Sequence, residues 1–403
     1  MVVPHSRSYQ GRPLFANSFR PFFLFGSIQA ALAILVWLPV FHGEIVLTSA
    51  FAPLDWHMHE MIYGFLPAVV TGFLFTAIPN WTGRLPIRGT PLAVLVVVWI
   101  VGRLAVTFSA GIGWAVAFVI DASFLALVAA ATAREIVTGR NWRNLIVVLL
   151  VLLMLTGNIV FHLEAHFRDA ANYGIRIGIA VVVALLSLIG GRIIPSFTRN
   201  WLVRENPGRL PVPFGPFDKV VTIFSAVTLL CWIVLPEHKV TGALAIAAGV
   251  LHLVRLSRWA GHRTTRERLL LILHIGYVFV PLGFLLQAAA VFGPLAPSAG
   301  IHAWMAGAAG IMTLAVMTRA SLGHTGQALT ASVVTQVIYA AVIVAALARI
   351  CAAVHPAFSD VLLHVAAGGW VVAFGGFALA FGPLLLGSRC RALAVAQELR
   401  RKS

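Results

Sequence analysis

The sequence is poor in charged residues and in cysteine. Only 10% of its 403 residues are Asp, Glu, Lys or Arg, whereas 60% are hydrophobic. This composition excludes an ordinary soluble globular protein and is typical of a chain that crosses a membrane several times. The three cysteines, Cys231, Cys351 and Cys390, are far apart, which argues against a disulfide framework or a cysteine-held metal cluster.

Acidic residues are also scarce, so the net charge is +16. This excess does not indicate a nucleic-acid partner, because the basic residues lie in short loops and form no basic face with interleaved aromatics. The most basic loop, from Arg255 to Arg268, is interpreted as a topology determinant that faces anionic lipid.

Apolar runs long enough to span a bilayer as helices recur along the whole chain. We therefore predict an all-α, polytopic membrane bundle of about twelve transmembrane helices, forming a single integral-membrane domain over residues 1–403. The predicted spans are 20–41, 57–79, 90–108, 112–133, 144–164, 173–195, 218–236, 240–257, 269–291, 300–318, 330–352 and 362–386.

The arginines in the loops support an even number of spans. With both termini inside, the outer loops hold only Arg168, Arg176 and Lys239, and the remaining loop arginines lie inside. Because Lys and Arg mark cytoplasmic loops, both termini are predicted to be cytoplasmic. The cytoplasmic segments are then residues 1–19 and the tail 387–403.

The second and tenth predicted spans resemble each other. One begins near His59 and ends at Thr82-Gly83, and the other begins near His302 and ends at Thr325-Gly326. This spacing favours three four-helix repeats, and repeats often place a site at their interface. The alternative is that Thr, Gly and Arg are simply common at inner helix ends.

Histidines gather at the predicted outer ends of several spans. Ionisable groups at membrane depth are costly and indicate function. Histidine with methionine suits copper, and histidine is also the usual axial ligand of haem. We predict a metal or haem site there, with His59, His162 and His302 as the first candidate ligands and His57, His166 and His364 as the next.

Residue spacing sorts these candidates. His57 and His59 are two residues apart and point about 200° apart on a regular helix, so they cannot bind one metal together. His59 shares a face with Tyr63, and His57 shares one with Glu60, a candidate partner for a neighbouring ligand. We expect His59 to face the interior of the helix bundle. His57 would then belong to a second site or lie at the outer membrane boundary.

The fifth and tenth spans carry polar stripes. His162 and His166 lie on one helix face together with Asn158, and Glu164 is beside them. On the tenth span, His302 shares a face with Met305, a candidate copper ligand. The small residues 306–310 that follow would allow either close helix packing or the approach of a flat macrocycle.

Two arginines, Arg103 and Arg349, lie inside predicted spans. They would hold haem propionates by charge-assisted hydrogen bonds, or Arg103 would instead form a buried ion pair with Asp121. Arg349 has no obvious acidic partner.

Several segments together resemble the NnrS family of bacterial membrane proteins. They are Phe19-Arg20-Pro21-Phe22-Phe23, His57-Met58-His59-Glu60-Met61, Asn80-Trp81-Thr82-Gly83-Arg84, Phe161-His162-Leu163-Glu164, Gly191-Arg192-Ile193-Ile194-Pro195-Ser196-Phe197-Thr198, and His302 through Gly326. The resemblance implies an inner-membrane protein that contains haem, of b type, and copper. It also implies a role in nitric oxide metabolism, denitrification or defence against nitrosative stress. It does not assign individual histidines to haem or copper, and the electron donor is unknown.

Two other functions remain open from the residues alone. A multi-pass transporter of a metal ion or small metabolite would use the histidines as its path, although such sites lie near the midplane rather than at one interface. A divergent relative of the haem-copper oxidases and nitric oxide reductases would share the twelve spans. That class is disfavoured because its adjacent His-His pair and its His-Pro-Glu signature are missing.

Overall fold

The computed structural model describes residues 9–168 and 170–387, and within these ranges the chain is helical without strands. Twelve helical segments are long and apolar enough to cross a membrane, which confirms the predicted fold class. The protein is therefore a multi-pass membrane protein. The predicted tail lies outside the described residues from position 388 onward, and the single-domain assignment and cytoplasmic termini stay predictions.

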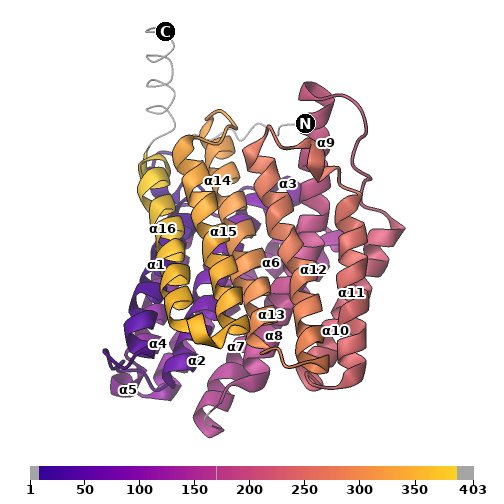
Figure 1. Cartoon of the computed structure of the whole chain (residues 1–403). Coiled ribbons are helices and arrows are strands. Elements are labelled where there is room, and N and C mark those ends of the chain that lie inside the picture. Colours follow the sequence, from indigo (N-terminus) through magenta and orange to yellow (C-terminus); the bar gives the residue numbers. More distant parts are fainter. Residues whose placement is uncertain (1–8, 169, 388–403) are drawn as a thin grey trace. The chain divides into compact units, whose positions relative to one another are not determined.

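The chain divides into two compact units. Unit 1 comprises Met1–Gly178, Met317–Leu329 and Phe374–Ser403, and unit 2 comprises Ile179–Val316 and Thr330–Ala373. The helices of unit 1, indigo to magenta in Figure 1, are α1 (Phe19–Phe41), α2 (Pro53–His59), η2 (Glu60–Phe65), α3 (Leu66–Thr82), α4 (Thr90–Thr107), α5 (Ser109–Ile112), α6 (Trp114–Thr138), η3 (Trp142–Asn144), α7 (Leu145–Phe167) and the start of α8 (Asn172–Leu185).

Unit 2 begins with the rest of α8. Its further helices are η4 (Leu186–Gly190), α9 (Gly191–Glu205), α10 (Pro216–Val234), α11 (Lys239–Ser257), η5 (Gly261–Arg263), α12 (Arg268–Phe292), α13 (Ser298–His302), η6 (Ala303–Gly310), the start of α14 (Ile311–Thr325), α15 (Val333–Val354), η7 (Pro356–Phe358) and the start of α16 (Ser359–Leu386). The ends of α14 and α16 belong to unit 1.

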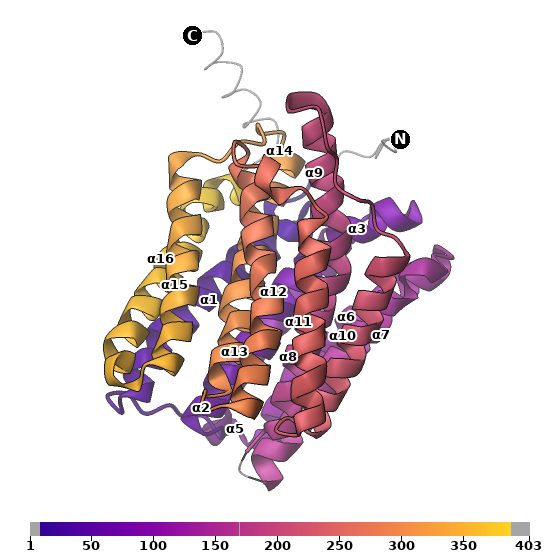
Figure 2. The ribbon, with the colours of Figure 1, turned by 45° about the vertical axis from the view of Figure 1, so that its right-hand side comes forward.

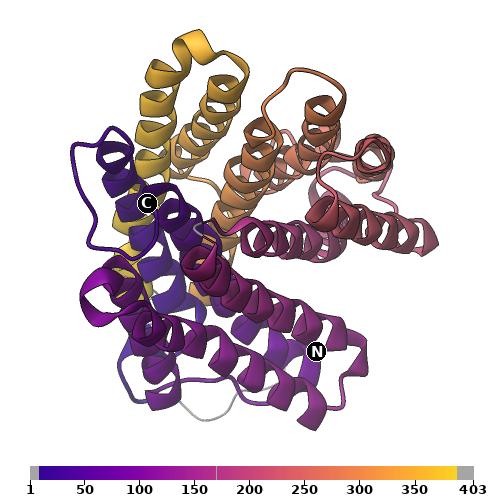
Figure 3. The ribbon, with the colours of Figure 1, turned by 90° about the horizontal axis from the view of Figure 1, so that it is seen from below.

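In unit 1, α6 packs against both α4 and α7, and α1 packs against α3. Figure 3 shows these indigo-to-purple helices from below. The start of α8 approaches α7 closely, because a Cβ on Gly174 would lie 2.4 Å from the backbone of Phe161. This glycine therefore sets the spacing of the two helices next to His162.

In unit 2, α10, α11 and α12 lie side by side, as Figures 1 and 2 both show. The helix η6 packs against α12 and α15. A Cβ on Gly307 would lie 2.3 Å from Phe279, and one on Gly310 would lie 2.7 Å from Trp370. Of the two interpretations of residues 306–310, these contacts favour close helix packing.

The matching Thr-Gly pairs both end helices. Gly83 follows α3 with φ +71°, and Gly326 follows α14 with φ +79°. This left-handed conformation is the usual end of a helix and costs glycine little. The Thr-Gly pairs thus mark the ends of these helices, which run beyond the predicted span ends at residues 79 and 318.

Three π-helical segments interrupt the second, sixth and tenth membrane-crossing segments, at η2, η4 and η6. Two of them begin directly after a histidine that the sequence singles out, His59 and His302. The three π-helical segments are four spans apart, which is the spacing that three four-helix repeats would give. The repeat itself stays a prediction.

Candidate functional site

The buried polar cluster of unit 1 begins at the junction of α2 and η2. His59 is the last residue of α2, and Glu60 opens the π-helical turn. Both side chains are buried, and Glu60 Oε1 lies 3.4 Å from His59 Nδ1. Glu60, which the sequence offers as a partner for a neighbouring ligand, thus lies beside His59.

His59 and His162 meet at a shared carboxylate. His59 Nε2 lies 3.2 Å from Asp121 Oδ2, and His162 Nε2 lies 3.1 Å from the same oxygen. The three side chains come from α2, α7 and α6, and all are buried. Their ligand atoms lie within 4.8 Å of one another, which is the spacing of a metal-binding group.

Asn158, one turn before His162 on α7, fixes the hydrogen-bond directions. Its Nδ2–H donates to Asp121 Oδ2 at 2.8 Å, so its Oδ1 faces His59 Nε2 at 3.0 Å. An amide oxygen and a carboxylate can only accept here. His59 Nε2 must therefore carry a hydrogen whenever no metal ion replaces it.

Arg103 on α4 binds the other side of the cluster. Its NH1 donates to Glu60 Oε1 at 2.6 Å, and its NH2 donates to Asp121 Oδ1. Of the two interpretations of Arg103, the structure has the buried ion pair. Trp99, also on α4, donates from Nε1 to the Gly64 carbonyl of η2 at 2.9 Å.

The charges of this cluster do not balance. Glu60 and Asp121 are two buried carboxylates, and among the described residues Arg103 is the one guanidinium joined to them. With neutral imidazoles, one negative charge is left over, which is costly away from water. The charge is balanced by a proton, on an imidazole or on a carboxyl group, or by a bound cation.

The donor set fits a transition-metal ion. Two imidazoles and a carboxylate suit copper, iron and zinc, and a bound ion would displace the Nε2 protons of His59 and His162. Arg103 holds the second oxygen of Asp121, and Glu60 lies beside the second nitrogen of His59. Outer partners of this kind orient ligands and tune metal affinity.

Aromatic rings cover the two imidazoles. The ring of Phe51, two residues before α2, lies 5.2 Å from the His59 ring and 5.1 Å from the His162 ring, between centroids. Phe161 contacts His59 at 5.1 Å. Phe51 is not among the predicted site residues, since nothing in its local sequence distinguishes it from other loop aromatics.

Tyr63 and Glu164 hold the surrounding backbone. The Tyr63 hydroxyl donates to the Gly174 carbonyl at 2.6 Å, and Glu164 Oε2 accepts from the Gly174 N–H at 2.8 Å. Both residues therefore fix the start of α8 against the site rather than contacting the shared carboxylate.

The other two histidines of unit 1 stack on tryptophans. His57 lies against Trp37, with centroids 4.5 Å apart, and His166 lies against Trp114 at 3.9 Å. His166 is exposed, although it shares a helix face with His162. In the structure, His59 and His162 are thus buried, whereas their sequence neighbours His57 and His166 are nearer the surface.

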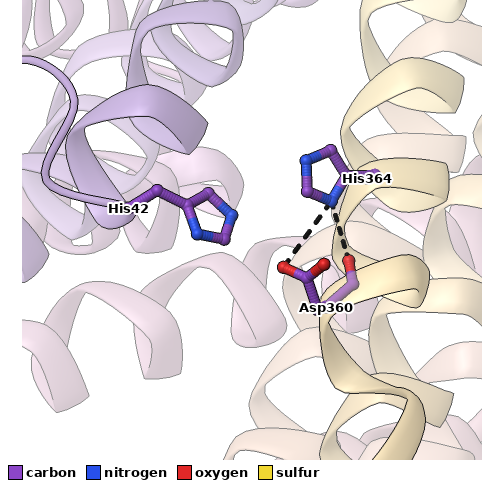
Figure 4. Close-up of side chains that lie close together, drawn as sticks. All are labelled: His42, Asp360 and His364. Carbon is purple, nitrogen blue, oxygen red and sulfur yellow. Dashed lines mark hydrogen bonds and ion pairs between the residues drawn. The ribbon is translucent and has the colours of Figure 1, made fainter.

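The remaining predicted ligands belong to unit 2. His302 and His364 each donate Nδ1–H to the carbonyl four residues before, in Ser298 at 2.7 Å and in Asp360 at 2.9 Å. Figure 4 shows the second of these bonds on α16. Because a carbonyl only accepts, both rings have Nε2 as the nitrogen able to ligate a metal.

Met305 and Arg349 are half-buried in η6 and α15. Arg349 has no hydrogen bond or ion pair to the described residues, in agreement with its lack of an acidic neighbour in sequence.

A second buried cluster lies in unit 2. Arg255 is fully buried and donates to Asp218 Oδ1 at 2.8 Å, to the Ser187 carbonyl at 2.9 Å and to the Tyr277 hydroxyl at 2.9 Å. The expectation that Arg255 belongs to a lipid-facing basic loop was therefore wrong. Unlike the unit 1 cluster, its one guanidinium and one carboxylate balance in charge.

Comparison with protein families gives a match over most of the chain. The family model described as NnrS protein matches residues 13–389, nearly the whole chain. No curated protein matches the chain significantly. At the level of that family the function is that of a nitric-oxide-related membrane protein. A match of this extent shows that the chain belongs to the NnrS protein family.

Proposed function

We propose that this protein binds copper and b-type haem and acts in nitric oxide metabolism or in defence against nitrosative stress. The observation that carries the proposal is the contact of His59 and His162 with the same buried oxygen of Asp121. In the proposal these three residues hold copper.

The uncompensated charge of the cluster supports a cation at this place. A bound monovalent ion would balance Glu60, Asp121 and Arg103 without requiring a protonated imidazole. Imidazole and carboxylate donors alone would also accept iron or zinc. The choice of copper rests on the family resemblance.

Haem is assigned to the imidazoles of unit 2. His302 and His364 have the ring orientation common to metal-bound histidines, with Nδ1–H donated to a backbone carbonyl. Arg103 is an unsuitable propionate partner, because two carboxylates already bind its terminal nitrogens. Bound haem iron and copper would supply nitric oxide binding and electron transfer.

The proposed location is the bacterial inner membrane, with the copper site toward the periplasm. The loop arginines support this orientation, because α7 ends beside Arg168, one of the few basic residues in the predicted outer loops. The end of unit 1 that carries His166 would then face the source of the metal ion.

Cofactor analysis of purified variants tests the assignment. We expect the wild type to contain copper and to show a Soret band. His59→Ala and His162→Ala should lose copper and keep haem, because each removes one buried ligand. His302→Ala and His364→Ala should lose haem and keep copper.

His57→Ala is the matched control, because its ring stacks on Trp37 outside the carboxylate cluster. It should keep both cofactors. A wild type without a Soret band and without copper, when grown with both available, would refute the proposal. Unchanged cofactor content in all four ligand variants would refute the residue assignment.

A further inference from the structure

A pocket in unit 1 connects an exposed histidine with the buried site. It is lined by Phe51, Ser109, Trp114, His162, Ala165 and His166, together with Ala50, Val106 and Ala117. His166 is exposed, whereas His162 is 2% exposed and contacts Asp121. The pocket therefore extends from the surface of the unit to one of the ligands proposed above.

The geometry of His166 suits transient metal binding. Its ring is nearly parallel to Trp114, at an interplanar angle of 17°, and it contacts Phe167 edge-on. These ring contacts hold the imidazole without using its nitrogens in a hydrogen bond to the described residues. Both nitrogens thus stay able to bind an ion.

His166 and His162 are successive imidazoles on one helix. Residues four apart in an α-helix have Cβ atoms about 5–6 Å apart on the same face. An ion bound by His166 can therefore reach His162 by exchanging one imidazole for another. Ala165, which precedes His166 on α7, also lines the pocket and contributes only a small side chain.

Phe51 lines the pocket and covers the two buried imidazoles. Its ring contacts the imidazoles of both His59 and His162. Its backbone is fixed by neighbours, since Ser49 Oγ donates to the Val106 carbonyl at 2.9 Å and Ala50 N–H donates to Ser109 Oγ at 2.7 Å. Rotation of this side chain would uncover one side of both imidazoles.

From this geometry we infer that the pocket is the loading route of the buried site. A transition-metal ion, copper under the proposed function on which this inference rests, binds His166 first. It then passes between Ala165 and Phe51 to His162, His59 and Asp121. His166 is a loading residue and is absent from the final ligand set.

Copper transfer kinetics test the route. Apo-protein in detergent is mixed with Cu(I) supplied as its bicinchoninate complex, and the loss of the visible absorbance of that complex gives the loading rate. We expect His166→Ala to load about tenfold more slowly, the lower end of the effect of losing an auxiliary metal partner, with unchanged final stoichiometry. Ala165→Leu, which narrows the pocket but keeps His166, should also slow loading.

His57→Ala is the matched control, because His57 also stacks on a tryptophan but does not line the pocket. It should load at the wild-type rate. If the wild type takes up no copper, the proposed function fails. If the wild type loads and His166→Ala loads equally fast, the route is wrong although the site stands. If His166→Ala loses stoichiometry, His166 is a ligand, which also overturns the route.

Discussion

Replacing Arg103 by Met should destabilise the protein by about 3–5 kcal/mol, the usual cost of breaking a buried ion pair. Arg103 is 5% exposed and is the one guanidinium that contacts both Glu60 and Asp121. Its loss leaves two buried carboxylates facing each other across the site. Equilibrium unfolding in mixed detergent and SDS measures the change in free energy.

Arg349→Met is the matched control for this experiment. Arg349 also lies in a membrane-crossing helix, but it has no ion pair to the described residues. Its replacement should cost less than about 1 kcal/mol. Adding Glu60→Gln to Arg103→Met should recover part of the loss, because it removes one uncompensated charge. Equal destabilisation by the two arginine variants would contradict the assigned role of Arg103.

Asp121→Asn should abolish tight copper binding while leaving the fold intact. The substitution removes the charged oxygen that both imidazoles share but keeps the shape of the side chain. Glu60 still pairs with Arg103 at 2.6 Å, so the remaining charges balance and the loss of stability should be smaller than in Arg103→Met. We expect copper affinity to fall by about 100-fold or more, beyond what the loss of an outer partner costs.

Glu164→Gln provides the comparison, because Glu164 is a second buried acid beside the site. It accepts a hydrogen bond from the Gly174 N–H, which glutamine can also accept. Its copper affinity should match that of the wild type in a chelator competition. If both variants lose affinity equally, the effect comes from general negative charge and not from ligation by Asp121.

The sequence predicted the parts of the site that follow from helical period and composition. The isolated Asp121 and Arg103 in apolar spans indicated an ion pair, and the four-residue spacing of Asn158 and His162 placed both on one face. The two-residue spacing of His57 and His59 correctly separated their directions. These inferences need only a regular helix, which holds over most of each span.

The contacts that the sequence did not predict depend on irregular structure and on tertiary packing. The contact of Glu60 with His59 lies where α2 gives way to the π-helical turn Glu60–Phe65, which a 3.6-residue period does not describe. Phe51 reaches the imidazoles from a loop whose path is set by Ser109, far away in sequence. Arg255 can be buried because the carboxylate of Asp218, on another helix, balances its charge. Such partners cannot be recognised from local pattern alone.

The central claim is that His59, His162 and Asp121 together hold a copper ion. Copper-edge X-ray absorption of the loaded wild-type protein tests it most directly, because the spectrum reports the atoms bound to copper independently of haem. The claim predicts a first shell of nitrogen and oxygen with imidazole scattering, which is lost in Asp121→Asn. A first shell dominated by sulfur, or one unchanged in that variant, would contradict it.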